Sequence, residues 1–230
     1  MAESNSCDIN AKSSCCSTQP SENSIDYKWH WDKAYSAREN EKLGWFERKS
    51  QQSLDLIKET KLPKDAAIFN VGSGSSILID NLLDEGYTNL IANDLSVESL
   101  RSLKKRVGNL DKIQFFVDDL LNPKQINKLK NIDLWNDRAV LHFFLKEQET
   151  NAYFSLLKQV LKPNEFVVIA VFNENGAEKC CGLPLKRYNL AMLQEQLGQE
   201  FKLLKSFNYT FINPYGGERP YIYTLFQRQQ

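Results

Sequence analysis

Two glycines separated by one residue, in Gly72-Ser73-Gly74, mark the part of the chain most suited to holding a ligand. They follow an apolar run that ends at Val71, and a segment with helical spacing, from Ile77 to Leu83, comes directly after them. Glycine has no Cβ, so the backbone can turn sharply there and approach a ligand closely. Free N–H groups at the start of the helix would then face an electron-rich partner. The pattern is common by itself, so its meaning depends on the residues that follow.

Asp94 is the first of those residues. It ends a second apolar run, residues 89–93, and lies 20 positions after Gly74. An acidic side chain at the tip of the second strand is the expected partner of a ribose diol in a βαβ unit, because an ionised carboxylate only accepts hydrogen bonds. The alternative is structural, since Asp94 or Ser96 could simply cap the helix predicted over residues 97–107.

Groups that could act on a substrate follow the fourth and fifth apolar runs. His142 is one of two histidines, and its ordinary pKa suits a general base; the alternative is a capping or core histidine. Asp137 and Arg138 could form an ion pair that orients other groups. Cys180, in a polar stretch of about twelve residues (173–184), could contact a thiol, a metalloid or a small organic substrate, or have no role.

These residues need a scaffold, and the chain alternates between strand and helix patterns. Strands are predicted over residues 67–71, 89–93, 113–117, 132–136, 165–172, 202–212 and 220–227. Helices are predicted over residues 50–58, 76–85, 96–107, 123–129, 147–161 and 189–198. The alternation predicts a mainly parallel sheet with helices on both faces. Residues 213–217 form a turn with Pro and Gly, so the last strand should be antiparallel.

Bulk properties exclude some classes of partner. The 230 residues include 29 basic and 29 acidic side chains, so a dominant nucleic-acid or anionic-membrane surface is not expected. We predict neither a nucleic-acid partner nor a membrane partner, no metal site, and a cytoplasmic location. Oligomeric state is left open. Five cysteines, two pairs of them adjacent, indicate reduced thiols.

The first 60 residues divide into two parts of different composition. Residues 1–25 are rich in Ser, Asn and Cys, and we predict a disordered tail, although Cys7, Cys15 and Cys16 leave capture of a soft ion open. Residues 26–230 are predicted to form a single domain whose first part, residues 26–60, is an aromatic lid. Within it, packing roles are expected for Trp29 and Trp31, and pocket positions for Tyr35, Trp45 and Phe46.

Taken together, the chain resembles a class I S-adenosylmethionine-dependent methyltransferase over about residues 27–228. The resemblance rests on the glycine loop, Asp94, Asp118-Asp119, Asn136-Asp137-Arg138 and the closing hairpin. It is closest to small bacterial members with an aromatic element, here Gly44-Trp45-Phe46-Glu47, that eukaryotic lysine methyltransferases share. The implied fold is α/β and Rossmann-like, a seven-stranded, mostly parallel sheet with a C-terminal antiparallel hairpin.

The resemblance implies S-adenosyl-L-methionine as cofactor and assigns residues to it. Asp119, preferred over Asp118, would accept from the adenine amino group, and Arg38 would meet the cofactor carboxylate. The cofactor-binding set is Tyr35, Arg38, Trp45, Asn70, Gly72, Ser73, Gly74, Asp94, Leu95, Asp119, Leu120 and Asn136, and the catalytic set is His142, Asp137, Arg138 and Cys180. Two positions depart from the family pattern: Asn70 replaces the usual acid and Ser76 the usual third glycine.

The function expected from this resemblance is methyl transfer to a small-molecule acceptor, with a thiol or another soft nucleophile among the candidates. A protein lysine methyltransferase is the alternative, and it would need an acidic groove, for which Glu47, Asp118, Asp137 and Glu174 are available. A non-catalytic binding protein is the alternative of another class, because Asn70 and Ser76 depart from the pattern.

Overall fold

The structure is a computed structural model that describes residues 25–74, 76–108 and 111–230. Its helices are α1 (Tyr27–Ser36), α2 (Gln51–Glu59), α3 (Leu78–Asp84), α4 (Val97–Val107), α5 (Glu147–Val160) and α6 (Leu190–Leu197), with 3-10 turns η1 (Asn40–Lys42), η2 (Ile126–Lys128) and η3 (Leu141–Phe143). The strands are β1 (Ile68–Val71), β2 (Leu90–Asp94), β3 (Ile113–Val117), β4 (Ile132–Arg138), β5 (Leu161–Phe172), β6 (Lys179–Cys180), β7 (Leu183–Pro184), β8 (Phe201–Ile212) and β9 (Glu218–Arg228).

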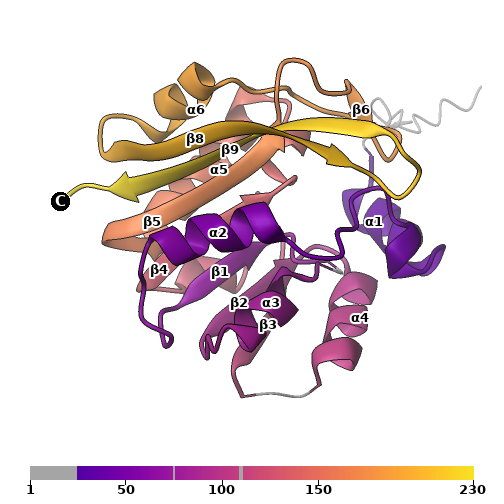
Figure 1. The fold of residues 1–230 in the computed structure, drawn as a ribbon, viewed down its shortest axis with the longest axis horizontal. Helices are drawn as coiled ribbons and strands as arrows, with labels where there is room; N and C mark the ends of the chain where they lie inside the picture. The colour runs from indigo at the N-terminus through magenta and orange to yellow at the C-terminus, as the bar shows by residue number, and fades with distance from the viewer. Residues whose placement is uncertain (1–24, 75, 109–110) are drawn as a thin grey trace, which may run out of the picture.

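Seven strands form one sheet in the order β3-β2-β1-β4-β5-β9-β8 (Figure 1). Strands β1 to β5 pair in parallel, and β9 runs antiparallel to both β5 and β8. The expected Rossmann-like sheet with its antiparallel end is therefore confirmed. The chain moves outward from β1 to β3 and then returns to β4, so β1 and β4 flank the point where the strand order reverses. Ligands of open α/β sheets bind at this point, outside the carboxyl ends of the strands.

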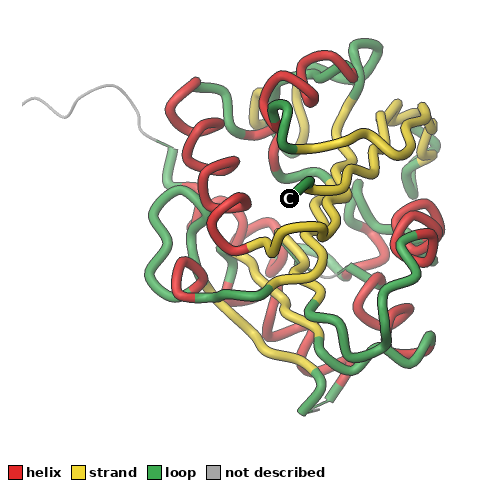
Figure 2. The backbone as a smooth tube through the Cα atoms, turned by 90° about the vertical axis from the view of Figure 1, so that its left-hand side faces the viewer, coloured by secondary structure: helices red, strands yellow, loops and turns green. Residues whose placement is uncertain are grey.

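Helices cover both faces of the sheet, as the red segments on either side of the strands show in Figure 2. One core packs α5 and α6 on the sheet through residues such as Trp135, Tyr153 and Leu193. The other packs α2, α3 and α4 through Leu54, Leu82 and Leu100. The central strands are buried along their length because both faces are covered, which explains their continuous apolar runs.

Helix α1 stands apart from these layers and lies near the carboxyl ends of the strands (Figure 1). It has no buried residue, but the rings of Trp31 and Tyr35 contact those of Trp45 and Phe143. Polar contacts add to this packing. Asp32 Oδ1 accepts from Ser96 Oγ at 2.6 Å and from Glu98 N at 3.3 Å, at the first turn of α4. These bonds fix α1 over the end of β2, beside Asp94.

The predicted elements agree with the structure in type, with one exception. A helix was expected over residues 123–129, and only η2 is present there. The Asp118 carboxylate accepts from the backbone N–H groups of Lys124, Gln125 and Ile126, which a helix would also leave without an internal partner. The turn ends at Leu129, whose backbone is extended, so no longer helix forms. The expected loop 173–184 also contains a small hairpin, β6–β7.

Part of the expected organisation stays a prediction. The tail predicted over residues 1–25 lies, except for Ile25, outside the described residues, as do Cys7, Cys15 and Cys16. Across the described ranges, no helix combines the length and the apolar character needed to cross a bilayer.

Candidate active site

A cleft opens at the carboxyl ends of β1, β2, β3 and β4 and has an empty volume of about 1100 Å³, including the part open to solvent. Its floor includes Gly72, Asp94 and Leu120 from the strand ends, and its roof includes Trp31, Tyr35 and Trp45 from α1 and the segment that follows it. The predicted residues Leu95 and Asp119 also line it. The cleft therefore brings together residues that are more than 80 positions apart in the chain.

The glycine loop lies against the roof and has no room for side chains. Gly72 and Gly74 have φ values of +51° and +50°, which L-residues with a Cβ adopt at a cost. A Cβ on Gly72 would collide with Val140, and one on Gly74 would collide with the Tyr35 hydroxyl. Ser73 Oγ donates to Asn70 O at 2.9 Å and closes the turn. Both glycines are thus required by conformation and by space.

Asp94 is buried beside this loop. Its Oδ2 accepts from Gly74 N at 2.8 Å, and its Oδ1 accepts from Ser96 N at 2.8 Å. Burial raises the pKa of Asp94 to about 6, although the Ser96 and Gly74 N–H groups favour the charged form. The capping role falls to Ser96, whose side chain accepts from Ser99 N. Asp94 therefore keeps its remaining lone pairs for the cleft, as ribose binding requires.

The two acids after β3 have different environments. Asp118 is buried, and its oxygens accept four N–H groups, from Asp119, Lys124, Gln125 and Ile126. Burial alone would raise the pKa of Asp118. The backbone N–H groups that donate to it, with that of Ile126 first, outweigh burial and hold the pKa below its ordinary value. Asp119 is half-buried and accepts from Leu121 N through Oδ1. Asp118 organises the loop, so Asp119 is the better placed of the two to face an adenine.

Aromatic rings form the roof. The Trp31 ring centroid lies 5.7 Å from that of Trp45 and 5.1 Å from that of Phe143, and the Tyr35 centroid lies 5.6 Å from that of Trp45. Burial and nearby Asp94 raise the pKa of Tyr35 well above its ordinary value, so its hydroxyl stays neutral. The packing role expected for Trp29 is wrong, because this side chain is 60% exposed on the outer side of α1.

His142, in η3 after β4, lines the cleft but is fully buried. Its Nδ1 accepts from Phe172 N at 3.5 Å, and within the described part of the chain its Nε2 has no partner. Burial, together with the Arg138 cation, lowers the pKa of His142 to about 3. The imidazole is therefore neutral at physiological pH, and the contact at Nδ1 assigns its hydrogen to Nε2.

Asp137 does not reach the cleft, which corrects its expected catalytic role. Its carboxylate accepts from Val140 N, Leu141 N and Tyr153 Oη at 2.8–3.0 Å and so caps η3 from inside the core. Burial raises its pKa to about 6. The expected pairing of Asp137 with Arg138 is also absent, because neighbouring strand residues point to opposite faces of the sheet.

Arg138 pairs with Glu47 instead. Its Nη2 lies 2.8 Å from Glu47 Oε1, Nη1 donates to Trp45 O at 3.2 Å, and Nε donates to Tyr223 Oη at 3.2 Å. The guanidinium also faces the Tyr221 ring at 5.1 Å. Burial opposes the cation, but Tyr223, Tyr221 and Glu47 raise the pKa of Arg138 further, so it stays charged. Arg138 holds the aromatic segment 45–47 against the end of β4.

Arg38, the expected partner of the cofactor carboxylate, is not brought to the cleft. It is exposed, and its Nη1 lies 3.4 Å from the hydroxyl of Tyr215 in the β8–β9 turn. The cation that the structure does bring to the cleft is Arg138. Phe143 and Tyr221 line the cleft from η3 and β9, although neither belongs to the expected cofactor-binding or catalytic set. The place of Tyr221 depends on strand pairing across the chain, which no local signal reveals.

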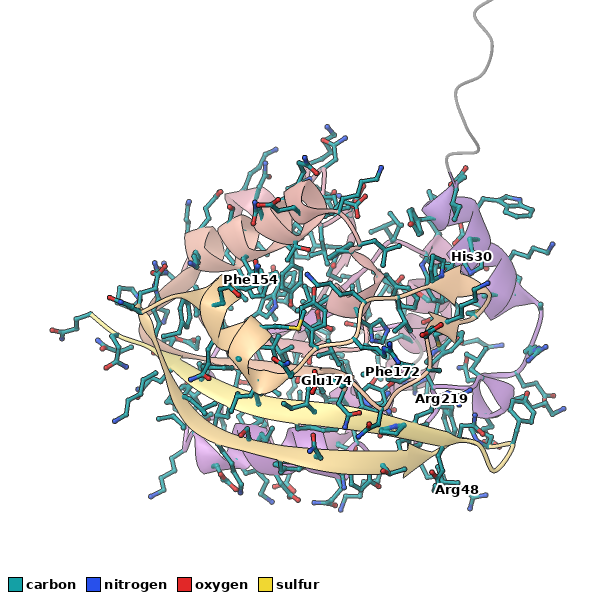
Figure 3. The ribbon with its side chains drawn as sticks, turned by 90° about the horizontal axis from the view of Figure 1, so that it is seen from above. His30, Arg48, Phe154, Phe172, Glu174 and Arg219 are labelled. Carbon is teal, nitrogen blue, oxygen red and sulfur yellow. The ribbon has the colours of Figure 1, made fainter. Side chains whose placement is uncertain are left out.

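The β6–β7 hairpin closes the far side of the cleft. Cys180 lines the cleft, and burial raises the pKa of its thiol to about 11, so it is protonated at neutral pH. Cys181 is exposed at the tip, with a φ of +53°. His30 of α1 lies beside the hairpin in Figure 3 and interacts with the Cys181 backbone. The hairpin and α1 thus meet over the cleft.

A second, smaller cavity adjoins the cleft through residues that line both, among them Tyr35, Gly72 and Arg138. The expected cofactor residues Asn70, Ser73 and Asn136 line this second cavity and not the larger cleft. Asn136 Nδ2 donates to Asn70 Oδ1 at 3.3 Å. Of the expected cofactor set, all members except Arg38 and Gly74 therefore line one of the two connected spaces, and Gly74 donates to Asp94, which does.

The residues present fit the cofactor that the sequence implies. Gly72 lines the cleft at the turn after β1, where a ligand can approach the main chain closely. The Asp94 carboxylate is held toward the cleft next to this turn, and aromatic rings that attract a sulfonium through cation–π contacts form the roof. Asp94 would hold the ribose and Asp119 the adenine.

Comparisons with known proteins agree with this geometry. Residues 69–169 match a family model described as a methyltransferase domain. The chain is 26% identical to EEF1A lysine methyltransferase 2 of Danio rerio over 161 residues, covering 64% of this chain and 68% of that protein. The same enzyme of Mus musculus is 26% identical over 165 residues, covering 65% and 66%. The chain thus spans about two thirds of the length of these relatives.

Solved structures show the same fold. A SAM-dependent methyltransferase from Anabaena variabilis superposes with a TM-score of 0.70 at 13% identity, covering 90% of this chain and 96% of that one. A protein from work titled "Conversion of a Disulfide Bond into a Thioacetal Group during Echinomycin Biosynthesis" gives 0.68 at 15% identity, covering 88% and 93%. Burkholderia thailandensis 1,6-didemethyltoxoflavin-N1-methyltransferase, with bound substrate and S-adenosylhomocysteine, gives 0.59 at 18% identity, covering 79% and 78%.

Proposed function

We propose that this chain, which is a class I S-adenosylmethionine-dependent methyltransferase, transfers the methyl group to a small neutral acceptor whose nucleophile is soft, such as a thiol. The bound cofactor supplies an electrophilic methyl group on a sulfonium. The chain must then align the acceptor, exclude water and accommodate the acceptor's proton. The residues at the far end of the cleft from Asp119 decide which acceptors are suitable.

The observation that carries the proposal is that, among the described residues, the carboxylates considered for an acidic groove face other groups or other spaces than that end of the cleft. A lysine acceptor needs a negative groove, and four carboxylates were candidates for it. Glu47 lines the second cavity and not this cleft, Asp118 is enclosed by backbone N–H groups, and Asp137 faces the core. Glu174 is exposed and accepts from Asn189. Glu149 also lines the cleft, and its Oε2 accepts from the N–H groups of Leu145 and Lys146. The placement and hydrogen bonds of these carboxylates therefore disfavour an ammonium group as the acceptor.

The walls of this end favour a small apolar molecule. Trp31, Phe143 and Tyr221 present rings to it, and the charged Arg138 is balanced by Glu47. The β6–β7 hairpin and α1 meet over it, which limits access for a folded protein. An uncharged molecule enters such a pocket without the desolvation cost that a lysine ammonium would carry.

His142 restricts the nucleophile further. With a pKa of about 3 and its hydrogen on Nε2, the imidazole is a hydrogen-bond donor at neutral pH rather than a base. It can orient the acceptor by donating to a lone pair. A thiol ionises near pH 8.5 without help, whereas a hydroxyl does not, so a thiol depends less on a strong base. We therefore assign His142 an orienting role toward the acceptor.

Protein lysine methylation remains the second candidate, because the two relatives with 26% identity carry that activity in their names. Their similarity covers about two thirds of this chain. The neighbour whose title concerns conversion of a disulfide to a thioacetal acts on sulfur chemistry, but its likeness to this chain is one of fold. An acceptor screen decides between these two classes.

The test uses full-length protein and S-adenosylmethionine labelled in its methyl group. The panel contains alkyl thiols, aryl thiols, phenols, primary amines, and a cell lysate whose protein is separated from small molecules after reaction. We expect label in the thiols, and strongly reduced labelling with the Asp94→Asn variant. Label confined to lysine residues of lysate proteins would contradict the proposal and establish the second candidate.

A further inference from the structure

The second cavity contains polar groups that the fold does not satisfy. It lies between the glycine loop, α2 and the segment around Trp45, and Glu47, Ser53, Asn70, Asn136 and Arg138 are among the residues that line it. Within the part of the chain that the structure describes, Ser53 Oγ and Asn136 Oδ1 are buried without a hydrogen-bond partner. Buried polar atoms without partners are uncommon, and each one has a cost. Their presence beside the cofactor cleft points to a ligand group.

The orientation of the two amides follows from the network. Asn70 Nδ2 donates to Ile68 O at 3.3 Å, so Asn70 Oδ1 must be the acceptor on the other side. Asn136 Nδ2 donates to that oxygen, which leaves Asn136 Oδ1 as the unpartnered atom. Both amides therefore present oxygen rather than N–H to their surroundings. A group with several N–H donors, such as an ammonium, is the complement of such a site.

Charge in this cavity comes from the ion pair of Glu47 and Arg138. Their side chains are 7% and 13% exposed, so the pair is nearly removed from water. Ionised groups at this depth carry a large desolvation cost, and apolar residues of similar size are often as stabilising. The pair joins two segments that are 91 positions apart, at the point where the cleft and the second cavity meet. A buried pair of opposite charges is the complement of a zwitterion.

We propose that the second cavity binds the zwitterionic α-amino acid end of the cofactor, and that Glu47 supplies the negative charge for its ammonium that Asn70 lacks. Asn70 Oδ1 and Asn136 Oδ1 complete the set of acceptors, and Arg138 faces the cofactor carboxylate in place of Arg38. This inference rests on the proposed function, because it requires a cofactor in the adjoining cleft. Glu47, in the aromatic segment, thus takes the role that the family pattern gives to an acid at position 70.

The assignment explains the departure at position 70. A second carboxylate there would lie in the same cavity as Glu47 and repel it, since two like charges that share a small site cannot both ionise. Asn70 keeps the acceptor oxygen and avoids that repulsion. Burial raises the pKa of Glu47, and Arg138 opposes that shift by favouring the charged form. The chain thus holds one carboxylate near the loop but places it on a different segment.

The experiment compares two ligands by titration calorimetry: S-adenosylhomocysteine, which has the amino acid end, and 5′-methylthioadenosine, which lacks it. We expect the Glu47→Gln variant to bind S-adenosylhomocysteine at least tenfold more weakly and methylthioadenosine within twofold of the wild type. Adding Asn70→Asp to that variant should recover most of the lost affinity. Glu41→Gln, at an exposed position of η1, is the matched control and should change neither affinity.

Two results would overturn the inference: an equal change for both ligands in Glu47→Gln, or no recovery with Asn70→Asp. Thermal unfolding checks that each variant is folded. If Glu47→Gln does not fold, the Asn70→Asp variant is tested alone. It replaces the neutral amide beside Glu47 by a carboxylate, so the affinity for S-adenosylhomocysteine should change by at least threefold. The affinity for methylthioadenosine should stay unchanged. An unchanged affinity for both would contradict the shared site. Absence of binding of either ligand to the wild type would instead refute the proposed function.

Discussion

The two ends of the cleft are built in different ways. At the cofactor end, the ligand would face backbone atoms and short acidic side chains at or just after the ends of β1, β2 and β3, such as Gly72, Asp94 and Asp119. At the acceptor end, it would face large side chains from α1, η3, the β6–β7 hairpin and β9, such as Trp31, Phe143 and Tyr221. One end is made by local turns and the other by long-range packing.

This difference has a functional consequence. A site formed by backbone geometry is rigid and binds one ligand in one pose. Substitution of a glycine or of Asp94 in it therefore removes the site itself. A site made of side chains on separate segments can change its specificity without loss of the fold. Substitutions at the cofactor end should therefore abolish ligand binding, whereas those at the acceptor end should alter stability, pH dependence or acceptor choice.

The largest effect is expected at Gly74. In Gly74→Ala, the new Cβ would collide with the Tyr35 hydroxyl at a position with a φ of +50°, so we predict at least a 50-fold loss of affinity for S-adenosylhomocysteine in titration calorimetry. Gly86→Ala is the control: its φ is +87°, and a Cβ there meets nothing within 4 Å. Both variants carry backbone strain of about 1–2 kcal/mol. Similar affinities in the two variants would show that the loop does not hold the cofactor.

Asp94→Asn should have the next largest effect. The carboxylate accepts N–H groups with both oxygens, so an amide must turn its NH₂ toward the N–H of Gly74 or of Ser96. We predict about a 30-fold loss of S-adenosylhomocysteine affinity, equivalent to about 2 kcal/mol. Asp84→Asn, at an exposed position at the end of α3, serves as the control. An unchanged affinity for adenosine-containing ligands in Asp94→Asn would rule out the ribose assignment.

At the acceptor end, His142 is expected to affect acid stability rather than cofactor binding. Its pKa is about 3 in the folded state and near 6.5 when unfolded, so the unfolded state binds more protons between these values. Its contribution to the free energy of unfolding is fully present above pH 6.5 and falls by up to about 1.4 kcal/mol per pH unit below it. His142→Gln should lose this dependence in urea unfolding between pH 7 and 4.

The comparison with the wild type isolates this effect, since Asp94 and Asp137, with pKa values raised to about 6, act in the opposite direction. Their folded forms bind more protons than their unfolded forms, so they lower stability as the pH rises toward 6. An identical pH slope in His142→Gln and the wild type would show that His142 is not buried as a neutral group. The affinity for S-adenosylhomocysteine should stay within twofold.

The smallest effect is expected at Cys180. Its thiol has a pKa of about 11 and is therefore protonated at neutral pH, which makes it a poor nucleophile. Cys180→Ser should lower the rate of methyl transfer less than threefold, and Cys181→Ser, on the exposed tip of the hairpin, should not change it. A loss of more than 100-fold in Cys180→Ser alone would assign this thiol a direct part in the reaction.

The same contrast decides what the sequence can predict. The cofactor end could be predicted because glycine turns and strand-end acids are local features at a characteristic spacing. The acceptor end could not, because it depends on which distant segments pack together: Glu47 reaches Arg138 across 91 positions, and Tyr221 arrives by pairing of β9 with β5. The face of a strand end was also ambiguous, so Asp137 was assigned to the cleft although it points into the core.

The helix predicted over residues 123–129 shows another limit. Its composition suits a short helix, but only the 3-10 turn η2 forms, because the backbone becomes extended at Leu129. The Asp118 carboxylate that accepts the N–H groups of this turn precedes the segment, so its contribution cannot be inferred from the periodicity of the segment itself. The length of this element therefore does not follow from local propensity alone.

Calorimetric titration of the wild-type protein with S-adenosylhomocysteine tests the central claim most directly. We predict binding of one ligand per chain with a dissociation constant in the micromolar range, equivalent to a binding free energy of about −8 kcal/mol. In Gly74→Ala we predict an affinity at least 50-fold lower. A wild-type protein that gives no binding at millimolar ligand, or binding that Gly74→Ala leaves unchanged, would contradict the assignment of this cleft as the cofactor site.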